Sequence, residues 1–187
     1  MSVFCSFCGS EKKTNFAFKK MYFNIPGLRN SGADHWQTIW EKKYPQKFIR
    51  INQDNWEEPD CTTWIQRIED TLSHHHLEEV ILIGHSVGCA TIVNWFGKFQ
   101  HKIKGAILVA PSDVERGDYP IYITGFIPLY LKPLPFKTIV IASTDDHVVD
   151  FERAEYFANI WGSEFITIEN GGHLEKDLDI NILKPFL

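Results

Sequence analysis

The stretch VILIGHSVGCA, residues 80–90, decides the fold of this 187-residue chain. Its first four residues are all apolar, which is typical of a strand covered on both faces within a parallel sheet. A glycine-containing turn follows at once, and apolar residues then recur at helical spacing as far as Phe99. The stretch therefore predicts a buried strand, a sharp turn and a helix in direct succession.

The same alternation of strand-like and helix-like segments extends outward in both directions. Further strands are expected where short apolar runs occur, at residues 20–25, 47–52, 103–110, 138–143 and 164–168. Helices are expected at residues 34–43, 62–72, 87–99 and 151–161, with Asp34 capping the first and Asp60 the second. This alternation predicts a three-layer α/β/α sandwich around a parallel sheet of about six strands.

Chain length and net charge restrict the number of domains and the classes of partner. The chain is long enough for one domain with its own core, which we place at residues 20–187, after a poorly ordered N-terminal extension at residues 1–19. The net charge of −5 argues against a general binder of nucleic acid or of anionic membranes, since such a binder needs a basic face. We therefore expect neither nucleic acid nor a membrane among the partners.

The four cysteines, Cys5, Cys8, Cys61 and Cys89, do not form the pattern of a disulfide framework, which favours a reducing compartment. With no long apolar span and no secretory leader in this sequence, we expect a cytoplasmic protein. Cys5 and Cys8 have the spacing of half a zinc ribbon, but a structural zinc site needs four ligands and no second such pair follows. We therefore expect no metal and no other cofactor.

Residues 84–88 carry the pattern G-x-S-x-G, which has a chemical meaning when it joins a strand to a helix. A serine at the tip of such a turn is held in a strained conformation that exposes its hydroxyl. Gly84 and Gly88 remove side chains that would collide there, and the start of the helix points the Val87 N–H at a developing negative charge. The pattern therefore predicts Ser86 as a nucleophile and Val87 as one oxyanion donor.

A serine nucleophile needs a base and an acid, which in this arrangement follow it on loops after later strands. His173 comes soon after the last expected strand, so it is the predicted base. Asp145 and Asp146 both follow the strand at residues 138–143, and Asp113 follows the strand before that one. Position alone leaves the acid open among these three aspartates.

Residues 112–136 interrupt the alternation with a long segment rich in proline, glycine and aromatic residues. Connections of this length in a compact domain are usually functional or mobile. The aromatic part, residues 119–136, is expected either to form an apolar wall of the site or to cover the core. Whether the segment acts as a lid is left open.

Four motifs lie in one register across residues 20–175. They are PGLRNSG at 26–32 followed by HWQT at 35–38, GHSVG at 84–88, ASTDDHV at 142–148, and GH at 172–173. Together they resemble the retinoblastoma-binding-protein-9-like (YdeN-like) serine hydrolases of the α/β-hydrolase superfamily.

The resemblance implies a minimal α/β-hydrolase fold with strand order 2-1-3-4-5-6 and no cap domain. It favours Asp146 as the acid, because the family's acid lies two residues before a valine, which here is Val148. It also implies a second oxyanion donor in the loop after Gly27, which we assign to the Leu28 N–H. Further substrate contacts are expected from Gly27, Asn30, Ser31, His35, Trp36 and His85.

Two functions from different classes are consistent with these patterns. The favoured one is a serine hydrolase that cleaves a small carboxylic ester, thioester or amide through an acyl-enzyme intermediate, carboxylesterase-like with a peptidase left open. The alternative is a protein-interaction module on a hydrolase scaffold, with a protein partner that the sequence does not indicate. A strained serine with an acid and a base favours the hydrolase, because a scaffold does not need them.

Overall fold

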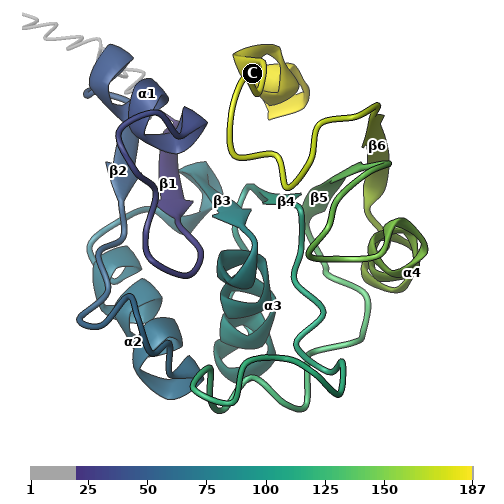
Figure 1. The fold of residues 1–187 in the computed structure, drawn as a ribbon. Helices are drawn as coiled ribbons and strands as arrows, with labels where there is room; N and C mark the ends of the chain where they lie inside the picture. Colours follow the sequence, from purple (N-terminus) through teal and green to yellow (C-terminus); the bar gives the residue numbers. More distant parts are fainter. Residues whose placement is uncertain (1–19, 187) are drawn as a thin grey trace, which may run out of the picture.

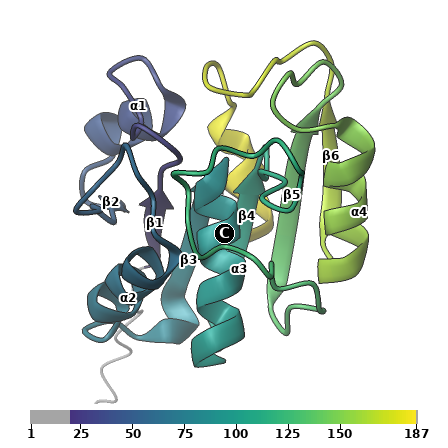
Figure 2. The same cartoon turned by 60° about the horizontal axis from the view of Figure 1, so that its bottom comes forward.

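The computed structural model describes residues 20–186, so the expected extension with Cys5 and Cys8 lies outside the described residues. Six parallel strands form one sheet in the order β2-β1-β3-β4-β5-β6, which Figure 2 shows side by side. They are β1 (Met21–Ile25), β2 (Phe48–Arg50), β3 (Val80–His85), β4 (Gly105–Val109), β5 (Lys137–Ser143) and β6 (Glu164–Ile168). The predicted sheet and strand order are confirmed, although β2 is shorter than expected.

The described residues form four α-helices: α1 (Trp36–Lys43), α2 (Cys61–Leu72), α3 (Val87–Phe99) and α4 (Phe151–Trp161). Asp60 caps α2 as predicted, because its carboxylate accepts a hydrogen bond from the Thr63 N–H at 2.9 Å. The cap predicted for α1 is wrong. His35 rather than Asp34 precedes this helix, and its ring Nδ1 accepts from the Gln37 N–H at 3.2 Å. No helix within residues 20–186 has the length and apolarity needed to cross a membrane.

The helices form the two outer layers of the sandwich (Figure 1). On one face lie α2, α3 and α4, whose buried side chains include Trp64, Trp95 and Phe157. On the other face lies α1, with Trp36, together with a C-terminal 3-10 helix at Ile180–Phe186. Because both faces are covered, the central strands are continuous apolar runs rather than alternating ones.

Residues 110–136 connect β4 to β5 without forming a helix, and they pass below α3 in the view of Figure 1. Asn94 of α3 fastens this segment, since its Oδ1 accepts from the Tyr130 N–H at 2.8 Å and its amide nitrogen donates to the Phe126 carbonyl. The buried apolar side chains of the segment include Phe126, Leu129 and Leu134. Its second half therefore covers the core, and no cap domain interrupts the described part of the chain.

Candidate active site

Ser86 occupies the sharp turn between β3 and α3. Its backbone has φ 55° and ψ −125°, a region that side-chain-bearing residues rarely occupy and that costs about 1–3 kcal/mol. The turn is held by neighbouring backbone, because the Ser86 N–H donates to the Val109 carbonyl of β4 at 3.0 Å. The strand–turn–helix pattern thus leads to the local conformation that a reactive serine requires.

The two glycines of the motif are needed because backbone lies where their side chains would be. A Cβ on Gly84 would lie 2.9 Å from the amide nitrogen of Cys89. A Cβ on Gly88 would overlap the Ile25 carbonyl oxygen at the end of β1 and lie 2.8 Å from that of Pro26. Main-chain atoms cannot move aside as a flexible side chain can, so any larger residue would open the turn.

His173 lies on the loop after β6 and is largely buried. Its ring Nδ1 lies 2.9 Å from Oδ2 of Asp146 and 3.0 Å from Oδ1. The carboxylate is itself fixed, because Oδ1 accepts from the Val148 N–H at 2.8 Å. A carboxylate at Nδ1 favours the tautomer with its proton there, which leaves Nε2 free to accept a proton.

The other two aspartates have different partners. Asp145 supports the turn before His173, because its Oδ1 accepts from the Gly172 N–H and from the Ser143 hydroxyl, each at 2.7 Å. These hydrogen bonds lower the pKa of the Asp145 carboxyl, and the one from Ser143 has the larger effect. Asp113 pairs with Arg153 at 3.0 Å. Among the three candidates, only Asp146 therefore contacts the His173 ring.

Two further histidines stand beside His173 in a buried row. The ring centroid of His85 lies 4.9 Å from that of His173 and 4.7 Å from that of His35. Burial, followed by the charges of His173 and His35, lowers the pKa of His85 well below its usual value. Neutral His85 can donate from Nε2 to the His173 carbonyl, at 2.8 Å, which fixes the backbone of the loop that carries His173. Burial, then Arg50 and His173, lower the pKa of His35 to about 4.

The loop after β1 lies directly against Ser86. A Cβ on Gly27 would lie only 2.8 Å from Cβ of Ser86 and 3.4 Å from its hydroxyl oxygen. The chain then turns through Arg29 and Asn30, which have φ values of 62° and 64°. Arg50 of β2 holds this turn, donating to the Asn30 side-chain oxygen at 2.8 Å.

The two expected oxyanion donors are available for a ligand. Leu28 follows Gly27 in the loop, and Val87 is the first residue of α3. Neither backbone N–H has a hydrogen-bond acceptor within the described part of the chain. Free amides at a helix start and beside a serine hydroxyl can bind developing negative charge.

A cavity of about 240 Å³ brings most of the expected site residues together. Its lining includes Gly27, Leu28, Asn30, His35, His85, Ser86 and His173. Ser31 and Trp36, which were expected to contact substrate, are not among its described lining residues. Both side chains make internal hydrogen bonds instead. The Ser31 hydroxyl donates to the Gln37 side-chain oxygen at 2.6 Å, and the Trp36 indole donates to the Leu174 carbonyl at 2.7 Å. Trp36 therefore anchors the loop that carries His173.

Ser112, in the segment after β4, was missed by the sequence analysis. Its hydroxyl lies 3.0 Å from that of Ser86, within hydrogen-bond distance. Ala110, two residues before it, has φ 47°, so the chain turns sharply there and directs Ser112 to the elbow. Neither the turn nor the contact has a periodic sequence signal.

Among residues 20–186, no three His, Cys, Asp or Glu side chains are grouped as a metal site requires. Cys61 and Cys89 are buried free thiols in α2 and α3, and burial raises the pKa of both.

Comparison with known proteins identifies the family. The family described as serine hydrolase matches residues 22–181. The hydrolase YdeN of Bacillus subtilis (strain 168) is 27% identical over 170 residues, which cover 84% of this chain and 87% of that protein.

Solved structures agree with this match. A YdeN-like hydrolase from Pectobacterium atrosepticum is 34% identical with a TM-score of 0.72, over 83% of this chain and 80% of the other. The ydeN gene product of B. subtilis has a TM-score of 0.69 at 22% identity, over 90% and 98%, and supports the fold. The YdeN-like family and the α/β-hydrolase fold expected from the sequence are thereby confirmed. This chain belongs to the serine hydrolase family, among its YdeN-like α/β hydrolases.

Proposed function

We propose that this hydrolase cleaves a small carboxylic ester, thioester or amide through a covalent acyl-enzyme intermediate. Ser86 is the nucleophile, His173 the general base and acid, and Asp146 the residue that orients the imidazole. The observation that carries the proposal is the contact of Asp146 with Nδ1 of His173, whose ring lines the same cavity as the strained Ser86. Family membership supports hydrolysis in general, while the choice of residues rests on this geometry.

The reaction follows from the His173 tautomer that Asp146 favours, in which Nε2 is free to accept a proton. Nε2 of His173 takes the proton of the Ser86 hydroxyl while its oxygen forms a bond to the substrate carbonyl carbon. The tetrahedral intermediate expels the leaving group, which receives that proton from His173. Water then attacks the acyl-enzyme, with His173 again as base, and this step releases the carboxylic acid and restores Ser86.

Several residues support this chemistry without reacting. The N–H groups of Val87 and Leu28 receive the oxyanion, and Gly27 allows the loop to approach closely. Asn30 and His35 line the cavity and are proposed to bound the substrate. For His85 we propose a positioning role instead, through its hydrogen bond to the His173 carbonyl. We also propose a small-molecule substrate and a cytoplasmic location.

Replacement of Ser86 tests the proposal. Ser86→Ala should lower the turnover of p-nitrophenyl acetate by about 10⁴-fold or more, because the triad acts as a unit. Ser73→Ala is the matched control, since within residues 20–186 the exposed Ser73 hydroxyl bonds only the Asp70 carbonyl at the end of α2. Turnover that persists in Ser86→Ala would discard the assignment. A wild-type protein inert to esters and to fluorophosphonate would favour the interaction module.

A further inference from the structure

Two cavities meet at Ser86. The cavity of about 240 Å³ and a second one of about 300 Å³ share Leu28, Ser86 and Val148, so they adjoin at Ser86. The second cavity is also lined by Ser112, Arg116, Asp118, Tyr119, Pro120, Ile123 and His147. A bound acyl compound has two arms at its carbonyl carbon, and each arm needs a space on one side of Ser86.

The position of His173 decides which arm each cavity receives. Its ring must reach both the serine oxygen and the leaving-group atom, because it passes the proton from one to the other. His173 lines the smaller cavity and is absent from the described lining of the larger one. The leaving group therefore belongs in the smaller cavity, and the acyl chain belongs in the larger one.

The larger cavity has mainly apolar walls. Its apolar lining includes Leu28 and Val148, together with Pro120 and Ile123 of the segment after β4. The Tyr119 hydroxyl remains protonated, because burial raises its pKa to about 12. This part of the 110–136 segment is therefore a wall of the site, while its second half covers the core.

The charged side chains of the larger cavity satisfy each other. Both guanidinium edges of Arg116 are occupied, with Nη2 donating to Asp118 at 2.7 Å and Nη1 to the Val148 carbonyl at 2.6 Å. A third Arg116 nitrogen, Nε, donates to the other oxygen of Asp118 at 2.5 Å. Because Arg116 already pairs with Asp118, a charged acyl chain would instead place its charge against the apolar walls of Leu28, Val148 and Ile123, which disfavours it.

We propose that the cavity lined by Pro120 and Ile123 binds the acyl chain, and that the substrates carry an acyl group whose chain is uncharged and apolar. This inference rests on the proposed function. In it, the bond from Ser86 Oγ to the acyl carbon forms, and the bond from that carbon to the leaving-group oxygen, sulfur or nitrogen breaks. The acyl chain stays in the larger cavity while the protonated leaving group departs past His173.

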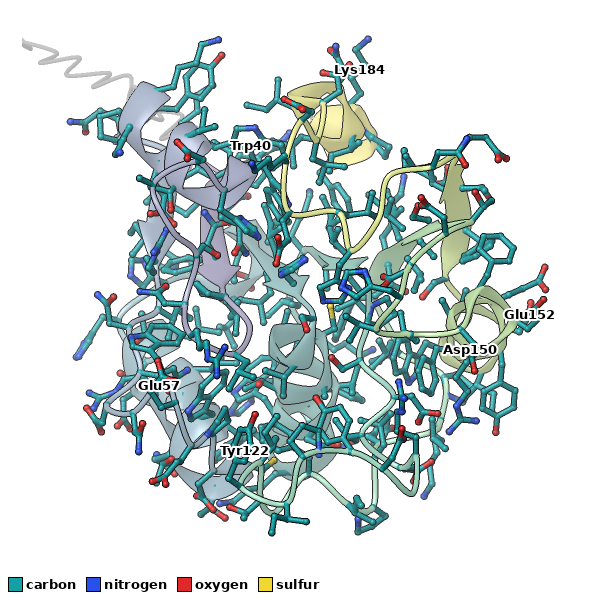
Figure 3. The ribbon with its side chains drawn as sticks, in the orientation of Figure 1. Trp40, Glu57, Tyr122, Asp150, Glu152 and Lys184 are labelled. Carbon is teal, nitrogen blue, oxygen red and sulfur yellow. The ribbon has the colours of Figure 1, made fainter. Side chains whose placement is uncertain are left out.

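The test compares one substitution at two positions of the same loop. Ile123→Trp fills the larger cavity, whereas Ile121→Trp is the matched control, since Ile121 is 95% exposed and does not line it. Figure 3 labels Tyr122, which stands between them on the surface of this loop. The measured quantity is the kcat/KM ratio of p-nitrophenyl octanoate to p-nitrophenyl acetate. We expect Ile123→Trp to lower this ratio by about tenfold or more, because a few methylenes in an apolar pocket carry this much discrimination.

Further arms keep the outcome decisive. Ile123→Ala, which only enlarges the cavity, should raise the octanoate-to-acetate ratio, and Ile121→Trp should leave it unchanged. Wild-type enzyme should prefer p-nitrophenyl pentanoate over the negatively charged p-nitrophenyl succinate half ester by about tenfold or more. A ratio that is the same in all three variants would overturn the inference. So would an Ile123→Trp enzyme that discriminates among leaving groups in acetate esters instead of among acyl chains.

The inference and the proposed function fail in different ways. If fluorophosphonate labels Ser86 but the Ile123 substitutions do not change the acyl preference, the assignment of the larger cavity to the acyl chain is refuted and the proposed function stands. Absence of both labelling and ester turnover in wild-type protein removes the proposed function and the inference together.

Discussion

Gly27→Ala should disable the nucleophile while leaving the fold in place. The new Cβ would lie 2.8 Å from Cβ of Ser86, whereas ordinary contacts begin at 3.4 Å, so the two must separate by about 0.6 Å to reach an ordinary contact. A misplacement of about 1 Å costs on the order of a hundredfold in rate. A shift of this size, which also moves the Leu28 oxyanion donor, should lower kcat/KM by about tenfold to a hundredfold.

The effect on stability should be smaller. Overpacking of this kind costs about 1–3 kcal/mol, and the loss of glycine flexibility in the unfolded chain offsets about 0.4–1 kcal/mol of it. We therefore expect Tm to fall by a few degrees, at about 2–4 °C per kcal/mol for a domain of this size. Gly32→Ala is the control in the same loop, since its Cβ would meet nothing within 4 Å and its φ is not positive.

The assays are p-nitrophenyl acetate turnover, the rate of fluorophosphonate labelling and thermal unfolding, on both variants and wild type. Gly32→Ala should match wild type in rate and be slightly more stable. If Gly27→Ala kept the kcat/KM of wild type, the loop after β1 would not lie against Ser86 as described. The Leu28 oxyanion role would then have no basis.

Three further predictions follow from the same site. Asp146→Asn should lower kcat by about 10⁴-fold through the wrong imidazole tautomer, whereas Asp145→Asn, whose amide oxygen can still accept from Gly172, should lose far less. Ser86→Gly should be more stable than Ser86→Ala in urea unfolding by about 1 kcal/mol, because glycine adopts φ 55° without strain, although both are inactive. The folded pKa of His35 is about 4 against 6.5 for the free side chain, so the unfolded chain binds more protons between these values and stability is lost as pH falls through that window. Urea unfolding of His35→Asn, which keeps a capping side chain for α1, should show a shallower loss of stability over the same range, by up to about 1.4 kcal/mol per pH unit.

The elbow and the order of the site residues could be predicted because their signals are local. An apolar strand, a G-x-S-x-G turn and an amphipathic helix are contiguous in sequence, and parallel strands bring the loops that follow them to one edge of the sheet. Position alone left three aspartates open, because Asp145 and Asp146 are neighbours on the same loop. The difference between them lies in side-chain direction, which spacing does not report.

Two of the features that the sequence analysis missed depend on contacts between distant segments. Ser112 reaches Ser86 only because Ala110 turns the chain after β4. His35 replaces Asp34 as the cap of α1 because its ring is held in the buried histidine row, while Asp34 is exposed. The C-terminal helix at Ile180–Phe186 is of the 3-10 type, so it lacks the 3.6-residue period that marks an α-helix.

The most direct test of the account is to map the residue that a fluorophosphonate probe modifies. The protein is labelled, digested and analysed by mass spectrometry, with Ser86→Ala and His173→Gln treated in parallel. We expect one adduct, on the peptide that contains Ser86, lost in the first variant and formed far more slowly in the second. An adduct on any other residue, or ester hydrolysis with Ser86 unmodified and no loss in His173→Gln, would contradict the account.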